Sequence, residues 1–183
     1  MRVLLHICCG ICAAPVIEQL MIEGHTVTGY FYNPNIHPAD EYERRRETAK
    51  KAAKHFDIDF VEGPYDRENW FTLVKGTEYE PEGGERCKRC FRMRLEKTYE
   101  YLKKQMFDRF TTTLTTSPLK DAAAINEIGR QIGGEKFISR DFKKKDGFKR
   151  AMEIAKELDL YHQDYCGCIY SQEEKIRQES KKG

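Results

Sequence analysis

The chain has 183 residues, enough for one domain that buries roughly 70% of the surface exposed by its unfolded form. Its 39% hydrophobic and 34% charged residues exclude a disordered chain, a collagen and a membrane-embedded protein. With 32 Lys and Arg against 30 Asp and Glu, the net charge is only +2, so we do not expect the chain as a whole to wrap a polyanion.

Short β-rich runs alternate with longer helical patterns along the chain. This alternation predicts a parallel sheet covered by helices on both faces. The predicted strands cover residues 3–7, 26–32, 58–61, 110–116 and 136–139. The predicted helices cover residues 13–23, 38–56, 69–75, 87–106, 117–132 and 148–158, and a polar helix follows Cys166. Ser117 and Pro118 are expected to cap and begin the fifth of these helices.

No change in composition marks a domain boundary, so we expect a single α/β domain over residues 1–183, doubly wound and mostly parallel, with helical additions. No stretch approaches the roughly 18 apolar residues that cross a bilayer. The chain also reaches Cys8 before a signal-peptide core is complete. We therefore expect a cytoplasmic protein with no membrane partner.

Seven cysteines are informative in such a protein, because a reducing compartment does not keep cysteines paired as structural disulfides. They fall into three groups, which are Cys8-Cys9-x-x-Cys12, Cys87-x-x-Cys90 and Cys166-x-Cys168. The first group follows the first predicted strand, and ligands of doubly wound sheets bind outside the carboxyl ends of the strands. The spacing predicts a site assembled from three distant loops.

The chemistry of that site stays open at this level. A single free cysteine is more often core than ligand, but two thiol groups on different loops favour a metal site. Thiolates suit both structural zinc and an iron–sulfur cluster, so the ligand type favours neither. Five cations surround the second thiol group and would favour thiolate there, namely Arg86, Lys88, Arg89, Arg92 and Arg94.

Cys166 and Cys168 allow two interpretations. A disulfide between residues two apart closes a small strained ring, which is easily reduced, and this favours a redox pair. The alternative is a further pair of metal ligands, joined by a carboxylate such as Asp141.

Six sequence blocks stand in one order between residues 5 and 171. They are Leu5-His6-Ile7-Cys8-Cys9-Gly10-x-Cys12; Tyr32-Asn33-Pro34-Asn35-Ile36-His37-Pro38 with Glu41-Tyr42 and Arg44-Arg45; Arg86-Cys87-x-x-Cys90-Phe91-x-x-Arg94-Leu95; Phe110-Thr111-Thr112-Thr113-Leu114 with Ser117-Pro118; Asp141-Phe142-Lys143-Lys144; and Tyr165-Cys166-Gly167-Cys168-x-x-Ser171. Together these blocks resemble the QueH family of epoxyqueuosine reductases.

The resemblance implies a Rossmann-like domain related to the adenine nucleotide α-hydrolases. It also implies reduction of epoxyqueuosine to queuosine at the wobble position of a tRNA with a GUN anticodon, without cobalamin. The resemblance implies that Cys8, Cys9, Cys87 and Cys90 hold a [4Fe–4S] cluster and that Cys166 and Cys168 form a redox-active pair. An additional iron ion is implied near the cluster, with the last two thiols and Asp141 as its candidate ligands. Gly10 and Ile11 depart from the Ala-Pro of many relatives but leave the thiols intact.

Removal of an epoxide oxygen consumes two electrons and two protons, so an external low-potential electron donor is expected. Candidate proton donors are His6, Tyr32, Tyr165 and Asp141, although His6 on an apolar strand is more often a satisfied core histidine. Basic runs at residues 86–94 and 143–150 predict phosphate contacts, and the aromatic residues within them, Phe91, Phe142 and Phe148, predict base stacking. Such runs are also found on ordinary solvated helices.

Two other functions compete with this one. A zinc-stabilised RNA-binding module would use the same thiols without catalysis. A sulfur-transfer enzyme of the same fold would need a Ser-Gly-Gly pyrophosphate loop after the first strand, where the chain has its first cysteine group instead.

Overall fold

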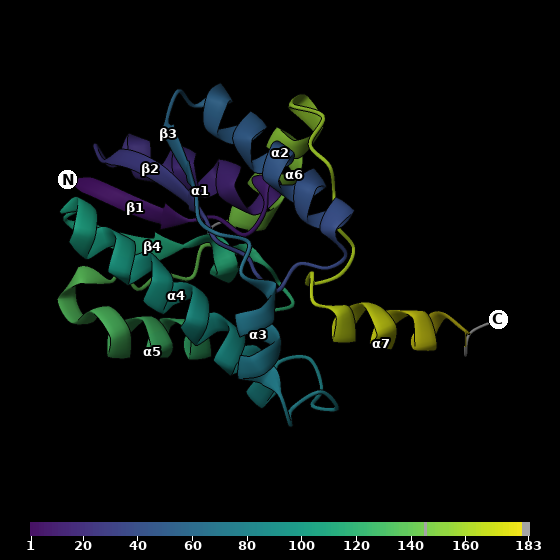
Figure 1. Ribbon diagram of the computed structural model, residues 1–183. Coiled ribbons are helices and arrows are strands. Elements are labelled where there is room, and N and C mark those ends of the chain that lie inside the picture. Colours follow the sequence, from purple (N-terminus) through teal and green to yellow (C-terminus); the bar gives the residue numbers. More distant parts are fainter. Residues whose placement is uncertain (145, 181–183) are drawn as a thin grey trace.

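A four-stranded, all-parallel sheet forms the centre of the computed structural model, which describes residues 1–144 and 146–180. Its strands stand in the order β3-β2-β1-β4 (Figure 1). They are β1 (Arg2–His6), β2 (Thr26–Phe31), β3 (Asp59–Glu62) and β4 (Arg109–Thr112). The helices are α1 (Gly10–Ile22), α2 (Ala39–His55), α3 (Arg67–Val74), α4 (Glu85–Gln105), α5 (Ala122–Gly133), α6 (Gly147–Glu157) and α7 (Ile169–Ser180), with 3₁₀ turns at Thr113–Thr116 and Gly134–Lys136.

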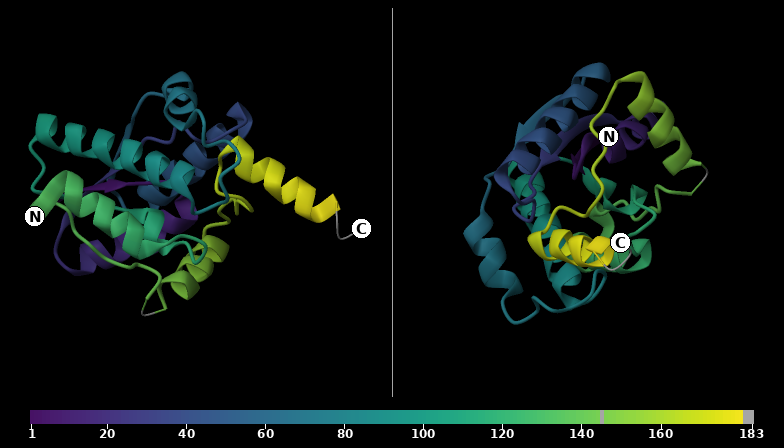
Figure 2. Two further views of the ribbon diagram at one scale, coloured as in Figure 1. Left: turned by 90° about the horizontal axis from the view of Figure 1, so that it is seen from below. Right: turned by 90° about the vertical axis from the view of Figure 1, so that its right-hand side faces the viewer.

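Helices cover both faces of the sheet, which confirms the predicted doubly wound α/β fold. Helices α1, α2 and α6 lie on one face, and α4 and α5 lie on the other (Figure 1). Helix α7 extends away from the rest of the molecule (Figure 2). No helix in the described part of the chain combines the length and hydropathy that a bilayer crossing requires.

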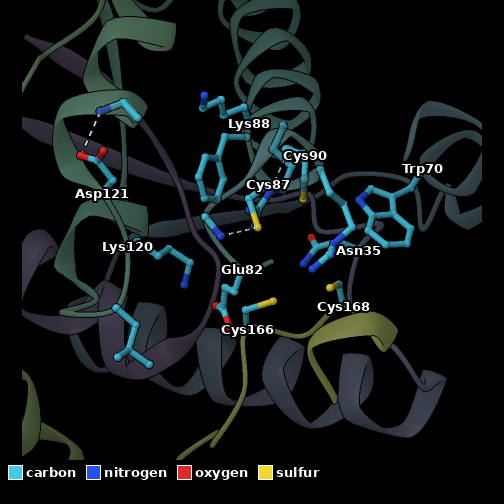
Figure 3. Close-up of a pocket in the computed structure, with 16 residues that line it drawn as sticks. Asn35, Trp70, Glu82, Cys87, Lys88, Cys90, Lys120, Asp121, Cys166 and Cys168 are labelled. Atoms are coloured by element: carbon cyan, nitrogen blue, oxygen red, sulfur yellow. Dashed lines mark hydrogen bonds between the residues drawn. The ribbon is translucent and has the colours of Figure 1, made fainter. Parts of the chain in front are cut away.

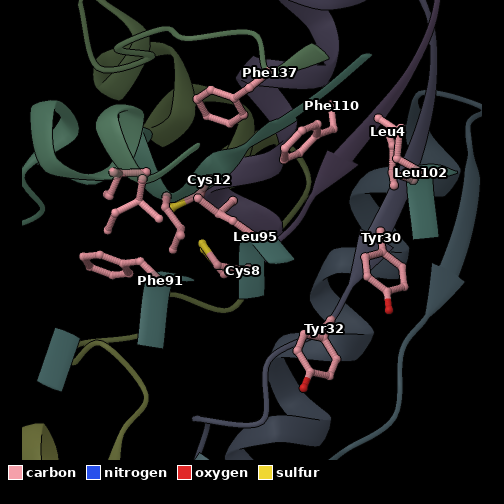
Figure 4. Packing of buried hydrophobic residues seen from close by; sticks show 14 of the residues in the cluster. Leu4, Cys8, Cys12, Tyr30, Tyr32, Phe91, Leu95, Leu102, Phe110 and Phe137 are labelled. Carbon is pink, nitrogen blue, oxygen red and sulfur yellow. The ribbon is translucent and has the colours of Figure 1, made fainter. Parts of the chain in front are cut away.

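Strand β1 is buried on both sides, as its apolar sequence predicts. Leu4 belongs to the buried cluster that contains Leu102 of α4 and Phe110 of β4 (Figure 4), whereas Leu5 belongs to the other large cluster, which contains Ile17 of α1. Two separate apolar layers therefore hold the carboxyl end of β1 in place.

The order of the strands creates a switch point beside β1. The chain runs outward from β1 to β3 and then returns through α3 and α4 to pair β4 with the free side of β1. The connections that leave β1 and β4 diverge at this point, and such a divergence opens a crevice at the carboxyl edge of a sheet. Cys8 follows β1 at this edge, where its backbone N–H donates to the Thr113 hydroxyl that follows β4 at 3.0 Å.

The predicted fifth strand, residues 136–139, is wrong. This segment meets β4 at a single bridge, Phe137 opposite Phe110. Strand β4 ends at Thr112, whose hydroxyl accepts a hydrogen bond from the backbone N–H of Leu114 at 3.1 Å and begins a 3₁₀ turn. The Ile138 backbone N–H still donates to the Phe110 oxygen at 2.8 Å, but the Ile138 oxygen accepts from the Thr111 hydroxyl at 2.9 Å instead of from a backbone N–H, so the pairing with β4 does not extend into a strand.

The predicted start of the fifth helix at residue 117 is also wrong. The cap is Asp121, whose carboxylate accepts from the backbone N–H groups of Ala123 and Ala124 at 2.8 and 3.2 Å. Residues 117–120 are therefore a loop at the carboxyl edge of the sheet, where the prediction placed a helical turn.

Gly10 allows a close approach of α1 to α2. A Cβ atom at this position would lie 2.4 Å from the backbone oxygen of Thr48. We expect Gly10→Ala to lower the free energy of unfolding by about 1–3 kcal/mol, as overpacking does elsewhere. Denaturant unfolding checks this, with Glu47→Ala on the exposed side of α2 as the control, expected within about 0.5 kcal/mol of wild type. An unchanged midpoint for Gly10→Ala would show that the two helices separate without cost.

Candidate metal centre

All seven cysteines line two adjoining cavities at the carboxyl edge of the sheet. One cavity, of about 580 Å³ with its open mouth, is bordered by Cys87, Cys90, Cys166 and Cys168 (Figure 3). The other, of about 730 Å³, is bordered by Cys8, Cys9, Cys12 and again Cys166. The two cavities share further walls at Glu82, Arg94, Leu119 and Lys120. The fold therefore brings the three thiol groups, which are far apart in the sequence, around one space.

The first thiol group is compact. The sulfur atoms of Cys8, Cys9 and Cys12 all lie within 4.8 Å of one another, which suits the binding of one metal centre. Cys8 accepts a hydrogen bond from the Thr113 hydroxyl at 3.2 Å, and Cys9 accepts one from the Gln163 amide at 2.9 Å. Hydrogen bonds from Cys12 and Cys9 lower the pKa of Cys8 well below its usual value, although burial opposes them. Hydrogen bonds to Cys8 and Cys9 in turn raise the pKa of Cys12 well above its usual value, so negative charge in this group is concentrated on the Cys8 sulfur.

Cys87 and Cys90 lie in the first turns of α4, where the spacing of three residues puts them on one side of the helix. The backbone N–H of Gly83 donates to the Cys87 sulfur at 3.2 Å. Burial raises the pKa of the Cys87 thiol to about 11. Cys87 also belongs to the same buried cluster as Cys8 and Phe91. A cation bound in this space is needed to keep Cys87 as a thiolate.

The third thiol group faces the second across the cavity: Figure 3 shows Cys166 and Cys168 on the side opposite Cys87 and Cys90. Arg45, itself buried and paired with Glu41 at 2.6 Å, donates to the backbone oxygen of Cys166 at 3.1 Å. A hydrogen bond from Cys168, together with the nearby charge of Lys120, lowers the pKa of Cys166 well below its usual value.

Glycine separates the two thiols of this third group, and Gly167 adopts a φ of +112°, a conformation that other residues rarely take. Neither thiol is in a disulfide, and all seven cysteines are free. The structure thus contains the predicted pair in its reduced form only.

Buried positive charge surrounds the thiols. Arg86 and Arg94 are only 2% and 3% exposed, and their guanidinium groups donate to uncharged oxygens such as the Glu78 backbone oxygen and the Asn33 side chain. Among the described residues, no carboxylate oxygen lies within 4.0 Å of Arg86, Arg94 or Lys120. A buried cation is costly without a counter-charge. Anionic sulfur in the two cavities would supply that charge.

The burial of these arginines corrects part of the predicted nucleic-acid surface. Arg86 and Arg94 cannot contact phosphate from inside the protein, so within residues 86–94 only the other three cations remain available. Phe91 and Phe142 are also buried, at 7% and 3% exposure, whereas Phe148 is 40% exposed. Lys145, within the second basic run, lies outside the described residues.

Asp141 is not brought to the thiols. It lines a separate depression between α1 and α6, together with Glu18 and Arg150, and pairs with Lys143 at 3.3 Å. Its partner Lys143 also donates to the backbone oxygen of Lys120 at 3.3 Å, so Asp141 supports the loop from outside the cavities.

The other predicted proton donors differ in position. His6 hydrogen-bonds to the Thr112 hydroxyl at 2.8 Å and to the Tyr32 backbone oxygen at 3.2 Å, and burial lowers its pKa to about 4. Like Tyr32, which is 1% exposed, it lies in the core and borders neither cavity. Tyr165 borders the second cavity, but its hydroxyl donates to the backbone oxygen of His37.

Several cavity residues have no role in the sequence-based prediction, among them Cys12 and Lys120. Cys12 was grouped with its neighbours but left without a function, although its position in the first turn of α1 turns it back toward Cys8 and Cys9. The incorrect prediction of a helix cap at residue 117 places Lys120 inside a helix and so gives no reason to expect it at a binding site. Its position after the fourth strand is the one signal that could have found it, because ligands meet such loops.

Comparisons with known proteins agree with this geometry. The family Epoxyqueuosine reductase QueH matches residues 3–174. Epoxyqueuosine reductase QueH of Haemophilus influenzae is 46% identical over 175 residues, covering 93% of this chain and 71% of that protein. The protein of the same name from Thermotoga maritima is 38% identical, covering 92% of this chain and 89% of its own length.

The fold also resembles a solved structure, the U34-tRNA thiolase NcsA from Methanococcus maripaludis with its [4Fe-4S] cluster. The TM-score is 0.57 at 15% identity, over 93% of this chain and 61% of the thiolase, so this likeness concerns the Rossmann-like fold alone. The family match and its curated relatives span almost the whole chain. The chain therefore belongs to the QueH family of epoxyqueuosine reductases, which are oxidoreductases.

Proposed function

We propose that this chain reduces epoxyqueuosine to queuosine at the wobble position of a GUN-anticodon tRNA, using a [4Fe–4S] cluster and no cobalamin. The reaction breaks both C–O bonds of the epoxide, forms a C=C bond and releases the oxygen as water, with two electrons and two protons taken up. The observation that carries the proposal is the convergence of seven free thiols on two adjoining cavities, bordered by the buried cations Arg86 and Arg94, which have no carboxylate partner among the described residues.

The residues around the cavities fit an anionic iron–sulfur cluster. Cys8 and Cys9 on one side, with Cys87 and Cys90 on the other, supply four thiolates. Backbone and side-chain groups already donate to three of these sulfurs, as at Cys9 and Cys87, and hydrogen bonds to sulfur help set the potential of such clusters. The negative charge of a thiolate-ligated cluster would neutralise Arg94, which is buried and has no carboxylate partner among the described residues. The structural neighbour NcsA, with its [4Fe-4S] cluster, is a precedent for this cofactor on this fold.

When bound, the cluster supplies electrons one at a time, so removal of the oxygen requires a second electron store. Cys166 and Cys168 face the same cavity as Cys87 and Cys90, and as a dithiol they would release two electrons on forming a disulfide. An external low-potential donor would then restore them. Asp141 has no part in this proposal, because it lies in a different depression.

A zinc-bound RNA-binding module remains the competing function. The decisive experiment is anaerobic incubation of the purified protein with epoxyqueuosine-containing tRNA and a low-potential reductant, followed by nucleoside analysis. Formation of queuosine supports the proposal. A colourless protein that contains one zinc ion and leaves epoxyqueuosine unchanged would exclude it.

The tRNA would approach in the cytoplasm from the open side of the two cavities. Leu119, 79% exposed, lies at this rim, and Lys88 extends from the start of α4 beside it. Arg92, one turn further along α4, is 43% exposed and contacts Gln131 at 2.6 Å. The wobble base must leave its stack to reach the cavities, so the phosphates beside it would pass over this rim.

We expect Lys88→Ala combined with Arg92→Ala to weaken tRNA binding about tenfold. The slope of log affinity against log salt concentration should also fall by the equivalent of one to two phosphate contacts. Binding measured over a range of salt concentrations checks this. The control is Lys104→Ala, about 24 Å further along the same helix, which should leave affinity unchanged. Equal affinity of the double variant and wild type would remove the start of α4 from the interface.

A further inference from the structure

Lys120 occupies the loop between β4 and α5 and borders both cysteine cavities. Figure 3 shows its ammonium group pointing into the space, on the side of Glu82 and Cys166. The loop is held from three directions. Asp121 caps α5, the Lys120 backbone N–H donates to the Ser117 oxygen at 3.3 Å, and the Lys120 backbone oxygen accepts from Lys143. The backbone of Lys120 therefore has a defined position at the border of both cavities.

The ammonium group is also chemically available. Among the described residues it has no carboxylate within 4.0 Å, and Glu82, a carboxylate that borders both cavities, accepts instead from the Ser171 hydroxyl at 3.1 Å. The ammonium group of Lys120 therefore has hydrogen-bond donors to offer.

The neighbouring cations cannot take the same role. The guanidinium group of Arg86 is bound by the backbone oxygens of residues 77, 78 and 80. Arg94 donates to the backbone oxygen of Cys90 and to the side chain of Asn33, both at 3.3 Å. Both arginines are therefore committed to holding the walls of the cavities. Of the two cations that border both cavities, Arg94 and Lys120, only Lys120 has donors to offer a substrate among the described residues.

We propose that the ammonium group of Lys120 binds the epoxide oxygen of the substrate and stabilises the negative charge that this oxygen acquires as its first C–O bond breaks. This inference rests on the proposed function. Two electrons come from the low-potential reductant, both C–O bonds break, a C=C bond forms, and the oxygen leaves as water with two protons. A donor fixed in advance at a developing oxyanion is typically worth about 10²–10³ in rate.

The test compares three variants loaded with iron and sulfide under the same anaerobic conditions. Lys120→Met removes the charge but keeps the length, Lys120→Arg keeps a charge, and Lys136→Met is the matched control on an exposed lysine beside the amino ends of the strands. We expect Lys120→Met to keep the iron content and visible absorption of wild type, while kcat falls about 10²–10³-fold and KM for tRNA changes by less than about threefold. Lys120→Arg should regain most of the lost rate, and Lys136→Met should match wild type.

Three outcomes would overturn the inference. The first is a Lys120→Met enzyme with the kcat of wild type. The second is a loss of iron from Lys120→Met that Lys120→Arg restores, because the charge would then serve the metal centre and not the substrate. The third is a change confined to KM, which would make Lys120 a tRNA contact. If wild type itself leaves epoxyqueuosine unchanged, the proposed function fails, and this result is distinct from all three.

Discussion

Replacing Cys87 with alanine should leave the protein without a stable iron–sulfur cluster and abolish its turnover. Cys87 is 8% exposed at the first turn of α4 and borders the first cavity, whereas the other proposed ligands Cys8 and Cys9 border the second. Removal of a thiolate opens one iron site to water and leaves a buried positive charge such as Arg94 without part of its counter-charge. Even loss of an outer hydrogen-bond partner costs a metal site about 10–100-fold, so a lost ligand should cost more.

Iron and sulfide content per chain, visible absorption and single-turnover reduction measure this effect. The informative comparison is Cys12→Ala, because Cys12 lies within 4.8 Å of the Cys8 and Cys9 sulfurs and yet is outside the proposed ligand set. We expect Cys12→Ala to retain the cluster. Loss of iron from Cys12→Ala together with retention in Cys87→Ala would replace the proposed ligand set by one built on Cys8, Cys9 and Cys12.

Replacing Cys166 with alanine should have the opposite effect to Cys87→Ala on the metal centre, because the iron content should stay normal. The rate of multiple turnover should fall by more than about 100-fold. Cys166 is the thiol of the third group whose pKa is lowered, which makes it the nucleophile of a dithiol pair. Without it Cys168 cannot form the proposed disulfide, whose formation would release two electrons. The fixed loop geometry, held by Arg45, is left intact by the change.

Rapid-quench assays separate the first turnover from later ones, and metal analysis is carried out on the same samples. Glu173→Gln, on an exposed position of the adjacent α7, is the control and should behave as wild type. Full multiple-turnover activity in Cys166→Ala would exclude the dithiol as an electron store. Loss of iron in this variant would instead make Cys166 a metal ligand.

Local sequence patterns were sufficient for the fold class, the family and the groups of thiols. Alternation of β-rich and helical periods depends on neighbouring residues only, so the doubly wound α/β architecture could be predicted without coordinates. The apolar run at residues 3–7 predicted a buried strand, and β1 is buried on both faces. The ordered motifs between residues 5 and 171 predicted the QueH family, which the match over residues 3–174 confirms.

Predictions from the sequence fail where two local signals compete, or where residues distant in the sequence form a residue's surroundings. Ser117 and Asp121 are both good helix caps, and the hydrogen bonds of Asp121 in the folded loop decide between them. A cationic run looks solvated in sequence, yet Arg86 and Arg94 point inward because α4 presents that side to the cavities. Asp141 follows a segment that pairs with β4 at one bridge only and does not form a strand. Its side chain lines a depression separate from the two cysteine cavities.

The sequence by itself determined which chemical groups are present and which elements carry them, since helix period, strand alternation and motif spacing are short-range properties. Only the tertiary structure decided which of those groups share a space. The return of the chain to pair β4 with β1 sets Cys8, Lys120 and Cys166 around adjoining cavities, although up to 158 positions separate residue 8 from residue 166. No local pattern encodes that meeting, because it arises from the packing of whole helices against a sheet.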